Sequence, residues 1–321
     1  MKTTSALAFG FIAASVATPL RYNVYEAASV GCGIPHKSGF NSNPDSHTIS
    51  SGGRSRTYAV RVPDGYNDDT FKPRKVIFDF HGRNGSPENQ YKNSQYDKYD
   101  AGKEYLVVYP AGVDAAWQGA PYAVQGVDDV LFVKDLLKRM REQYCVDDNH
   151  VYASGKSNGG GFVDTLACSD EGGEFAAFAM AAAALYDDTS KERCSKRRAI
   201  LEAHGGNDDT IKYGGGPTNS GGVSPNVADW VTWWAERDGF AAGAAETTQH
   251  SGYETVTYKG DGGKPVVQHY KIFDLGHCWP SSTGDNSDGS RSYCKDHSLD
   301  FTPAVLDFFS QWDLSSAPKQ I

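Results

Sequence analysis

Apolar residues along this chain fall into short runs, separated by glycine-rich turns and by longer amphipathic stretches. Short runs rich in β-branched and aromatic side chains and bounded by turn residues predict buried strands. The run at 56–62 alternates polar and apolar residues, which is typical of a half-exposed edge strand. The alanine-rich stretch 175–185 fits a strand or a helix, and we assign it to a strand. The expected strands are 56–62, 75–80, 105–109, 175–185, 199–204 and 266–273.

Other stretches place apolar residues every three or four positions, which is the period of an amphipathic helix. Such helices are expected over 128–144, 227–240 and 298–312. Because strands alternate with helices, we predict a mostly parallel central sheet with helices on both faces. Ligands bind such sheets beyond the carboxyl ends of the strands. The chain has no internal repeat and no linker rich in Ser and Thr, so a single domain is expected over 18–321.

The composition indicates a globular protein without a nucleic-acid partner. Of the 321 residues, 39% are hydrophobic and 22% are charged, as in an ordinary globular protein and unlike a disordered one. The formal net charge is −9, and no stripe of Lys and Arg interleaved with aromatic residues stands out. A nucleic-acid partner is therefore not expected.

The N-terminus has the pattern of a secretory signal peptide. Lys2 gives a positive start, 6–16 is apolar, and residues 15–17 form a small-x-small cleavage pattern. We expect a signal peptide at 1–17, although 26–28 offers a second cleavage site. The apolar stretch is too short to cross a membrane, and no later stretch reaches about 18 apolar residues. The mature protein is therefore expected to be secreted and free of membrane spans.

The six cysteines of an exported chain indicate three disulfides. Cys168 with Cys194 is the first choice, since these residues bracket a helix, a strand and a short loop. A bridge at Cys278 would fix the loop that carries His277. The remaining pairings stay open. None of the cysteine and histidine spacings is that of a zinc site.

The chain is organised around a Gly-x-Ser-x-Gly sequence at 155–159. A β-prone run precedes it and a helical stretch over 162–167 follows, which is the context of a nucleophile elbow. Ser157 would occupy the strained apex, and the helix would direct its N-terminal amide dipoles at charge developing beside it. The alternative is a glycine-rich turn without chemistry.

Two further segments follow strands in the same way, 204–211 and 274–280. They give the chain order Ser157, Asp208, His277, which is the order of nucleophile, acid and base in α/β hydrolases. A serine hydroxyl needs a base to take its proton during attack, and His277 supplies one. Asp208 would orient the imidazole and stabilise its charged form.

Other acidic and basic residues compete for two of these roles. Asp209 adjoins Asp208 and is an alternative acid. Asp274 is an alternative too, but it lies three residues before His277 and fits a loop carboxylate better. His204 is an alternative base, yet it precedes the acid loop and breaks the chain order, so a structural role is expected.

The segment 81–83, after the strand at 75–80, matches the position of the first oxyanion-hole loop in α/β hydrolases. The backbone N–H groups of Arg83 and Asn158 are the expected donors to the negative oxygen of the tetrahedral intermediate. Losing one such donor typically costs about 3 kcal/mol. The alternative is a simple glycine turn. Asn84 begins a glycosylation sequon, which we expect to stay unoccupied because a glycan there would crowd the site.

Five segments together resemble a known family. They are 80–82, 127–130, 153–160, 204–208 and 276–280. On these motifs, from about Cys32 to Trp312, the chain resembles the fungal secreted feruloyl esterases of carbohydrate esterase family one and the related polyhydroxybutyrate depolymerase-like esterases. The resemblance implies an α/β-hydrolase fold, with Ser157, Asp208 and His277 as the triad.

The same resemblance implies that the substrate is a ferulate ester-linked to arabinose on cell-wall xylan. Charged Lys156 and Arg83 depart from the family pattern near the site. Rival functions are acetylxylan esterase, polyhydroxybutyrate depolymerase-like esterase and, more remotely, a carbohydrate-binding relative without catalysis.

Trp117, Tyr122 and Trp279 are candidates for a wall that stacks on a phenolic ring or a sugar face. Ordinary loop packing is the alternative for each of them. Asp128 and Asp129 suit a helix start, with metal ligation as the alternative. The mechanism needs no metal or cofactor.

Overall fold

The computed structural model describes residues 1, 29–45, 47–241, 243–294 and 298–319. Except for Met1, the expected signal peptide at 1–17 lies outside the described residues, as does the alternative cleavage site at 26–28. None of the described helices has the length and apolar character needed to cross a membrane.

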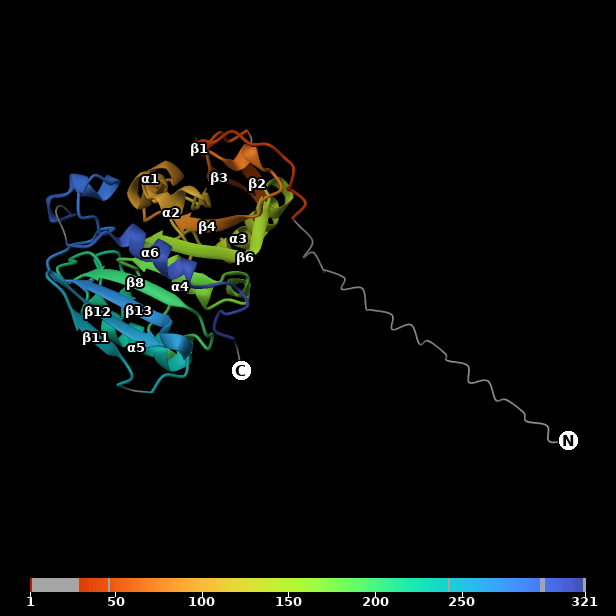
Figure 1. Cartoon of the computed structure of the whole chain (residues 1–321). Coiled ribbons are helices and arrows are strands. Elements are labelled where there is room, and N and C mark those ends of the chain that lie inside the picture. Colours follow the sequence, from red (N-terminus) through yellow and green to blue (C-terminus); the bar gives the residue numbers. More distant parts are fainter. Residues whose placement is uncertain (2–28, 46, 242, 295–297, 320–321) are drawn as a thin grey trace.

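An 11-stranded sheet runs through the molecule (Figure 1). Its central strands β5, β4, β6, β7, β8 and β13 are parallel neighbours, and the outer strands pair antiparallel at both edges. In spatial order the strands are β1 (Gly39–Asn41), β3 (Arg54–Val62), β5 (Leu106–Pro110), β4 (Arg74–Phe80), β6 (Val146–Lys156), β7 (Ala177–Ala181), β8 (Ile200–Gly205), β13 (Pro265–Ile272), β12 (Tyr253–Lys259) and β11 (Glu246–Gln249), with β2 (Thr48–Ser51) beside β3. Two short strands, β9 (Gly216–Pro217) and β10 (Val223–Ser224), form a separate pair.

Helices cover both faces of the sheet (Figure 1). They are α1 (Pro87–Ser94), α2 (Asp100–Lys103), α3 (Asp129–Gln143), α4 (Asn158–Ala167), α5 (Val227–Arg237) and α6 (Phe301–Ser310). The α6 ring of Phe309 stacks on Tyr152 of β6 with centroids 4.6 Å apart. Helices α4 and α5 are joined by the indole N–H of Trp234, which donates to Asp164 at 3.0 Å. Covered on both faces, central strands such as β4 and β7 are buried almost throughout, and β7 and the run 76–78 of β4 are entirely apolar.

Asp79 is a fully buried carboxylate inside β4. Its carboxylate accepts hydrogen bonds from Gln90 at 2.9 Å and from Ser154 at 2.8 Å. The sequence required such partners, because an unpaired buried carboxylate is costly.

The elements expected from the apolar pattern are present, and the structure adds short elements, such as β1, β2, α1 and α2, that the pattern did not predict. The strand expected at the sheet edge, β3, is internal, since β1 and β2 flank it. Strands β11 and β12 had no counterpart in the expected pattern. All four residues of β11 are exposed, so this strand lacks the apolar alternation that marks a half-buried one.

All six cysteines pair, as Cys32–Cys145, Cys168–Cys194 and Cys278–Cys294. Three disulfides and the Cys168–Cys194 pairing were expected, and both are confirmed. The third bridge starts directly after His277 and ties its loop to Cys294.

Candidate active site

The turn at Ser157 has the geometry of a strained elbow between β6 and α4. Ser157 has φ 57° and ψ −119°, which is an unusual backbone conformation for a residue other than glycine. A Cβ on Gly155 would lie 2.6 Å from the carbonyl oxygen of Gly159. A Cβ on Gly159 would lie 2.2 Å from the carbonyl oxygen of Phe80. Only glycine fits either place, so the two glycines let the turn close and let α4 approach β4.

Three side chains from distant parts of the chain meet at this turn. The Nε2 atom of His277 lies 2.7 Å from Oγ of Ser157, and its Nδ1 atom lies 2.7 Å from Oδ2 of Asp208. The serine follows β6, the aspartate follows β8, and the histidine follows β13. Because these strands are parallel, their carboxyl ends share one edge of the sheet. The structure therefore brings together the three residues expected from chain order.

Asp208 is held by more donors than His277 alone. Its Oδ1 atom accepts the backbone N–H groups of Thr210 at 2.9 Å and of Ile211 at 2.8 Å. Burial alone would raise the pKa of this carboxyl, but hydrogen bonds from His204 and His277 hold it well below its usual range. Asp208 is thus ionised and fixed in orientation.

The alternative acids and the alternative base make other contacts. Asp209 is exposed and accepts from the Thr210 hydroxyl. Asp274 is exposed as well. His204 is fully buried, with one ring nitrogen on Glu202 and the other on the carbonyl oxygen of Ile211.

Burial lowers the pKa of His277, and the nearby Lys156 charge lowers it further. The imidazole is therefore neutral near neutral pH, which is the form that accepts a proton. Ser157 and His277 are each 9% exposed, whereas the Asp208 side chain is fully buried. The serine and the histidine thus keep a small exposed surface that the aspartate side chain lacks.

The Lys156 charge, which departs from the family pattern, is compensated inside the protein. Its Nζ lies 3.2 Å from Oδ2 of Asp288. Asp288 also accepts from the backbone N–H of Trp279 at 2.9 Å and from Asn93 at 3.1 Å, and it pairs with Arg291. Lys156 therefore ties the elbow to the loop that follows His277.

The expected oxyanion loop lies against the serine. A Cβ on Gly82 would lie 3.3 Å from Cβ of Ser157, so the next residue, Arg83, is close to the nucleophile. The Asn158 side chain accepts the backbone N–H of Trp117 at 2.8 Å. Asn158 is also the first residue of α4, where N–H groups have no partner within the helix. The donor roles of Arg83 and Asn158 remain predictions.

Two of the three aromatic residues expected to contact substrate are core residues, and that prediction is wrong for them. Trp117 is 0% exposed, stacks on Phe162 and donates its indole N–H to the carbonyl of His81 at 2.8 Å. Trp279 is 1% exposed and donates to Thr302 at 3.0 Å. Both rings are covered by other side chains, so they pack inside the protein and support the loops that carry the site.

Tyr122 is half-buried and remains a candidate for substrate contact. The Arg83 guanidinium lies 4.0 Å from the centroid of its ring, and the Tyr186 ring meets it edge-on. Tyr186 in turn lies with its hydroxyl 3.1 Å from Thr218. Sequence reasoning missed Tyr186, because the loop after β7 carries no motif.

The acidic residues at the start of α3 have structural roles. Asp128 caps the helix by accepting the backbone N–H of Leu131 at 2.9 Å. Asp129 pairs with Arg56 at 2.7 Å and accepts the N–H of Gln118 at 2.8 Å. These contacts fit the helix-start interpretation of both residues.

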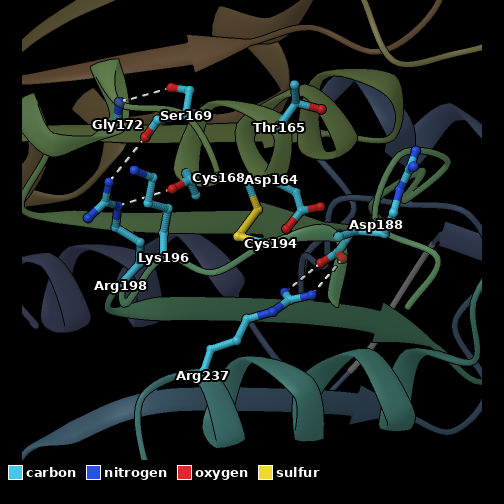
Figure 2. Close-up of a disulfide and its surroundings, with 12 residues drawn as sticks. Asp164, Thr165, Cys168, Ser169, Gly172, Asp188, Cys194, Lys196, Arg198 and Arg237 are labelled. Carbon is cyan, nitrogen blue, oxygen red and sulfur yellow. Dashed lines mark hydrogen bonds and ion pairs between the residues drawn. A yellow bond between two sulfur atoms is a disulfide. The ribbon is translucent and has the colours of Figure 1, made fainter. Parts of the chain in front are cut away.

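One group of potential metal-ligating atoms occurs among the described residues, in Asp164, Cys168 and Asp188, all within 4.8 Å of one another. The Cys168 sulfur is bonded to Cys194, and Asp188 is paired with Arg237 (Figure 2). A disulfide sulfur is not a thiolate, which is the form of cysteine that binds metals. The group lacks the donor set of a metal site.

No protein-family model matches the chain. Individual curated proteins do match it in sequence. The chain is 32% identical to feruloyl esterase D of Neurospora crassa over 154 residues, which cover 44% of this chain and 50% of that protein. It is 30% identical to feruloyl esterase C of Emericella nidulans over 168 residues, or 51% of this chain and 58% of that protein. A bifunctional acetylxylan esterase/xylanase of Neocallimastix patriciarum is 29% identical over 138 residues, or 43% of this chain and 20% of that protein. The matched part thus spans about half the length of the two feruloyl esterases.

Solved structures match over more of the chain. An acetyl xylan esterase from Aspergillus awamori superposes with a TM-score of 0.56 at 15% identity, covering 79% of this chain and 94% of that one. An S-formylglutathione hydrolase from Agrobacterium tumefaciens gives a TM-score of 0.50 at 12% identity, covering 87% and 98%. At such identities the likeness concerns the fold. The expected α/β-hydrolase fold is confirmed, and the chain is a homologue of the feruloyl esterases over about half of its length.

Proposed function

We propose that this protein is a serine carboxylesterase that releases ferulic acid from feruloylated arabinoxylan. The observation that carries the proposal is the hydrogen-bonded series from Ser157 through His277 to Asp208, with 2.7 Å at both contacts. Homology to feruloyl esterases supports the ester class and the acyl group.

In the acylation step, Oγ of Ser157 attacks the ester carbonyl carbon while Nε2 of His277 takes the hydroxyl proton. The tetrahedral oxyanion accepts hydrogen bonds from the backbone N–H groups of Arg83 and Asn158. The intermediate then collapses, the bond to the alkoxy oxygen breaks, and His277 returns its proton to the departing sugar hydroxyl.

In deacylation, a water molecule takes the place of the alcohol. His277 accepts a proton from it, and the oxygen attacks the acyl carbon bound to Ser157. Collapse of the second intermediate breaks the bond to Oγ, which recovers the proton from His277. The products are ferulic acid and a free sugar hydroxyl, and no electron transfer or cofactor enters the balance.

Asp208 acts by stabilising the imidazolium that exists during both steps. Its carboxylate is ionised because hydrogen bonds outweigh the cost of its burial. The Cys278–Cys294 bridge and the contact of Asp288 with the N–H of Trp279 hold the loop that bears His277. The base is thus positioned before substrate arrives.

The place of action follows from the same proposal. Feruloylated polysaccharide or oligosaccharide lies outside cells, and the three disulfides fit an oxidising, extracellular environment. We therefore propose a secreted enzyme with Tyr122 beside the acyl group.

Acetylxylan esterase activity is the second candidate. It is favoured by the burial of Trp117 and Trp279, which removes two of the three rings expected to stack on ferulate. The relative from Neocallimastix patriciarum also bears an acetylxylan esterase name.

Hydrolysis of methyl ferulate, 4-nitrophenyl acetate and polyhydroxybutyrate by the purified protein separates these functions, with Ser157→Ala as the control for contaminating activity. We expect ferulate release by the wild type alone. Acetate release without ferulate release would move the substrate to acetylated xylan, and soluble products from the polyester would point to a depolymerase. A protein that hydrolyses none of them but is retained on insoluble arabinoxylan would be a binding protein.

A further inference from the structure

A second set of ionisable side chains lies behind Asp208, away from the serine. Glu202 and His204 are two residues apart on β8, so both point to the same face of the sheet. His269 of the neighbouring strand β13 lies in register with Glu202. The three side chains are at most 1% exposed. A serine, a histidine and an aspartate suffice for the proposed mechanism, so these residues require another explanation.

Both ring nitrogens of His204 face oxygen atoms that accept hydrogen bonds. Nδ1 lies 2.9 Å from Oε1 of Glu202. Nε2 lies 2.8 Å from the carbonyl oxygen of Ile211 and 3.4 Å from Oδ2 of Asp208. Although burial alone would raise the pKa of Glu202, the two histidines hold it below its ordinary value, so this carboxyl is ionised. An ionised carboxylate and a carbonyl oxygen have no proton to donate, so each ring nitrogen of His204 carries its own. His204 is therefore an imidazolium cation.

The surroundings supply what a buried cation needs. An isolated charge in the core is costly, but this one lies between two carboxylates, Glu202 and Asp208. Although burial alone would lower the pKa of His204, the charge of Glu202 and the hydrogen bonds to Asp208 and Glu202 raise it to about 10.

We propose that His204 is a permanently charged positioning residue that, with Glu202 as its counterion, holds the Asp208 carboxylate towards His277. Oδ1 of Asp208 is fixed by the N–H groups of Thr210 and Ile211. Oδ2 lies between His277 at 2.7 Å and His204 at 3.4 Å. The charge of His204 thus reaches the reacting serine only through Asp208 and His277. This role rests on the proposed function, whereas the protonation of His204 is measurable without it.

The cation also affects how His277 titrates. Its positive charge disfavours a second positive charge on the neighbouring imidazole, so it lowers the pKa of His277, as Lys156 does more strongly. The other ionisable groups facing this network are Glu202, Asp208, His269, Tyr213 and, over the Tyr213 ring, Lys271. Removing the His204 charge therefore raises the pKa of His277 and moves the acid limb of activity to higher pH.

The direct test is NMR of protein labelled with ¹⁵N at histidine, recorded on the wild type and on Ser157→Ala. We expect both ring nitrogens of His204 to carry protons from about pH 5 to about pH 9 in both proteins. A ring nitrogen without a proton at neutral pH would overturn the proposal. Since Ser157→Ala needs no activity for this measurement, the result stands apart from the success or failure of the esterase assignment.

The kinetic test compares His204→Gln with His47→Gln. His47 is another buried histidine, beside Tyr58 and directly before β2, and controls for the loss of a core imidazole. For His204→Gln we expect the acid limb of kcat/KM to rise by about one pH unit, hence about a tenfold loss on that limb, with KM little changed. His47→Gln should keep the wild-type profile.

Glu202→Gln removes the counterion with little change of shape, so His204 should lose its proton at neutral pH. We expect the acid limb to move in the same direction as in His204→Gln but by less, because the lost carboxylate charge acts in the opposite sense. An unchanged acid limb in folded His204→Gln would overturn the positioning role. If His204→Gln does not fold, the proposal is tested by the acid limb of Glu202→Gln and by the NMR measurement on the wild type. An unchanged acid limb, or a ring nitrogen of His204 without a proton at neutral pH, would overturn it.

Discussion

Helix α4 has a buried polar cluster with a carboxylate at each end, and the two clusters differ in what they leave free. At its N-terminus lie Ser157, His277 and Asp208. At its C-terminus Asp164 faces Asp188, beside the Cys168–Cys194 bridge (Figure 2). Both clusters are formed by side chains that come from distant parts of the chain.

The C-terminal cluster is saturated by its own contacts. Both oxygens of Asp188 accept from Arg237, each at 2.7 Å. Burial and the charge of Asp188 hold the pKa of Asp164 well above its usual range, which favours the neutral carboxyl, and Asp164 accepts from Trp234 at 3.0 Å. No donor, charge or thiol in this cluster is available for a reaction.

The N-terminal cluster has the opposite character. Asp208 is ionised, His277 is neutral, and Ser157 is held in strained backbone and keeps 9% of its surface exposed. The comparison teaches that residue type alone does not mark a reactive site. What marks it is an ionised carboxylate whose hydrogen bonds end at a nucleophile that solvent reaches.

The most direct test of this difference between the two clusters is to replace aspartate by asparagine at both ends of α4. Asp208→Asn should lower kcat by about 10⁴-fold, because the amide cannot stabilise the His277 imidazolium and favours the wrong tautomer. Asp164→Asn should leave kcat within about threefold, because a neutral carboxyl is replaced by a neutral amide of the same shape. Steady-state kinetics on a soluble ester measure both, and similar losses at the two positions would contradict the distinction.

Arg237→Met should act on stability and leave the chemistry alone. It would leave the buried Asp188 carboxylate without its ion-pair partner and lower the free energy of unfolding by about 3–5 kcal/mol. The control is Arg141→Met, since Arg141 pairs with Asp148 and Glu174 near the surface and should cost at most about 1 kcal/mol. Urea unfolding followed by fluorescence measures both, and equal costs would argue against a buried ion pair.

Replacing Cys168 and Cys194 together by serine opens a loop of 26 residues. Loss of this cross-link should lower the free energy of unfolding by about 3 kcal/mol, with kcat of the folded protein unchanged. Thermal unfolding and kinetics on one preparation test this. A loss of kcat at temperatures where the variant is fully folded would show that the C-terminal cluster matters for the reaction.

The smallest effect concerns pH. Burial and Lys156 lower the pKa of His277, so activity should fall only as pH drops through a midpoint below the ordinary histidine value of about 6.5. The sign follows because the protonated imidazole cannot accept the serine proton. The profile of kcat/KM against pH gives the midpoint, and a midpoint above about 7 would contradict the assigned environment.

The parts of the site that local sequence determines were predictable. Ser157, Asp208 and His277 each follow a recognisable apolar strand, and a parallel sheet brings such strand ends together. The pairing of Cys168 with Cys194 also followed from nearby sequence.

Contacts between distant segments were not predictable in this way. Lys156 looked like an uncompensated charge, since its partner Asp288 is 132 residues away. Trp117 and Trp279 looked available to substrate, because their loop sequences do not reveal which side chains cover them. The contact of His204 with Asp208 was missed for another reason: the two residues are four positions apart, but the sequence does not show that the ring turns toward that carboxylate.

The central claim is that Ser157 is an activated nucleophile, and labelling with a fluorophosphonate tests it most directly. Mass spectrometry of the wild-type protein should find one adduct, on the peptide that carries Ser157. Ser157→Ala should take up no label, and His277→Ala should take it up far more slowly. A folded wild-type protein that stays unmodified at Ser157, or that is labelled equally fast without His277, would contradict the account.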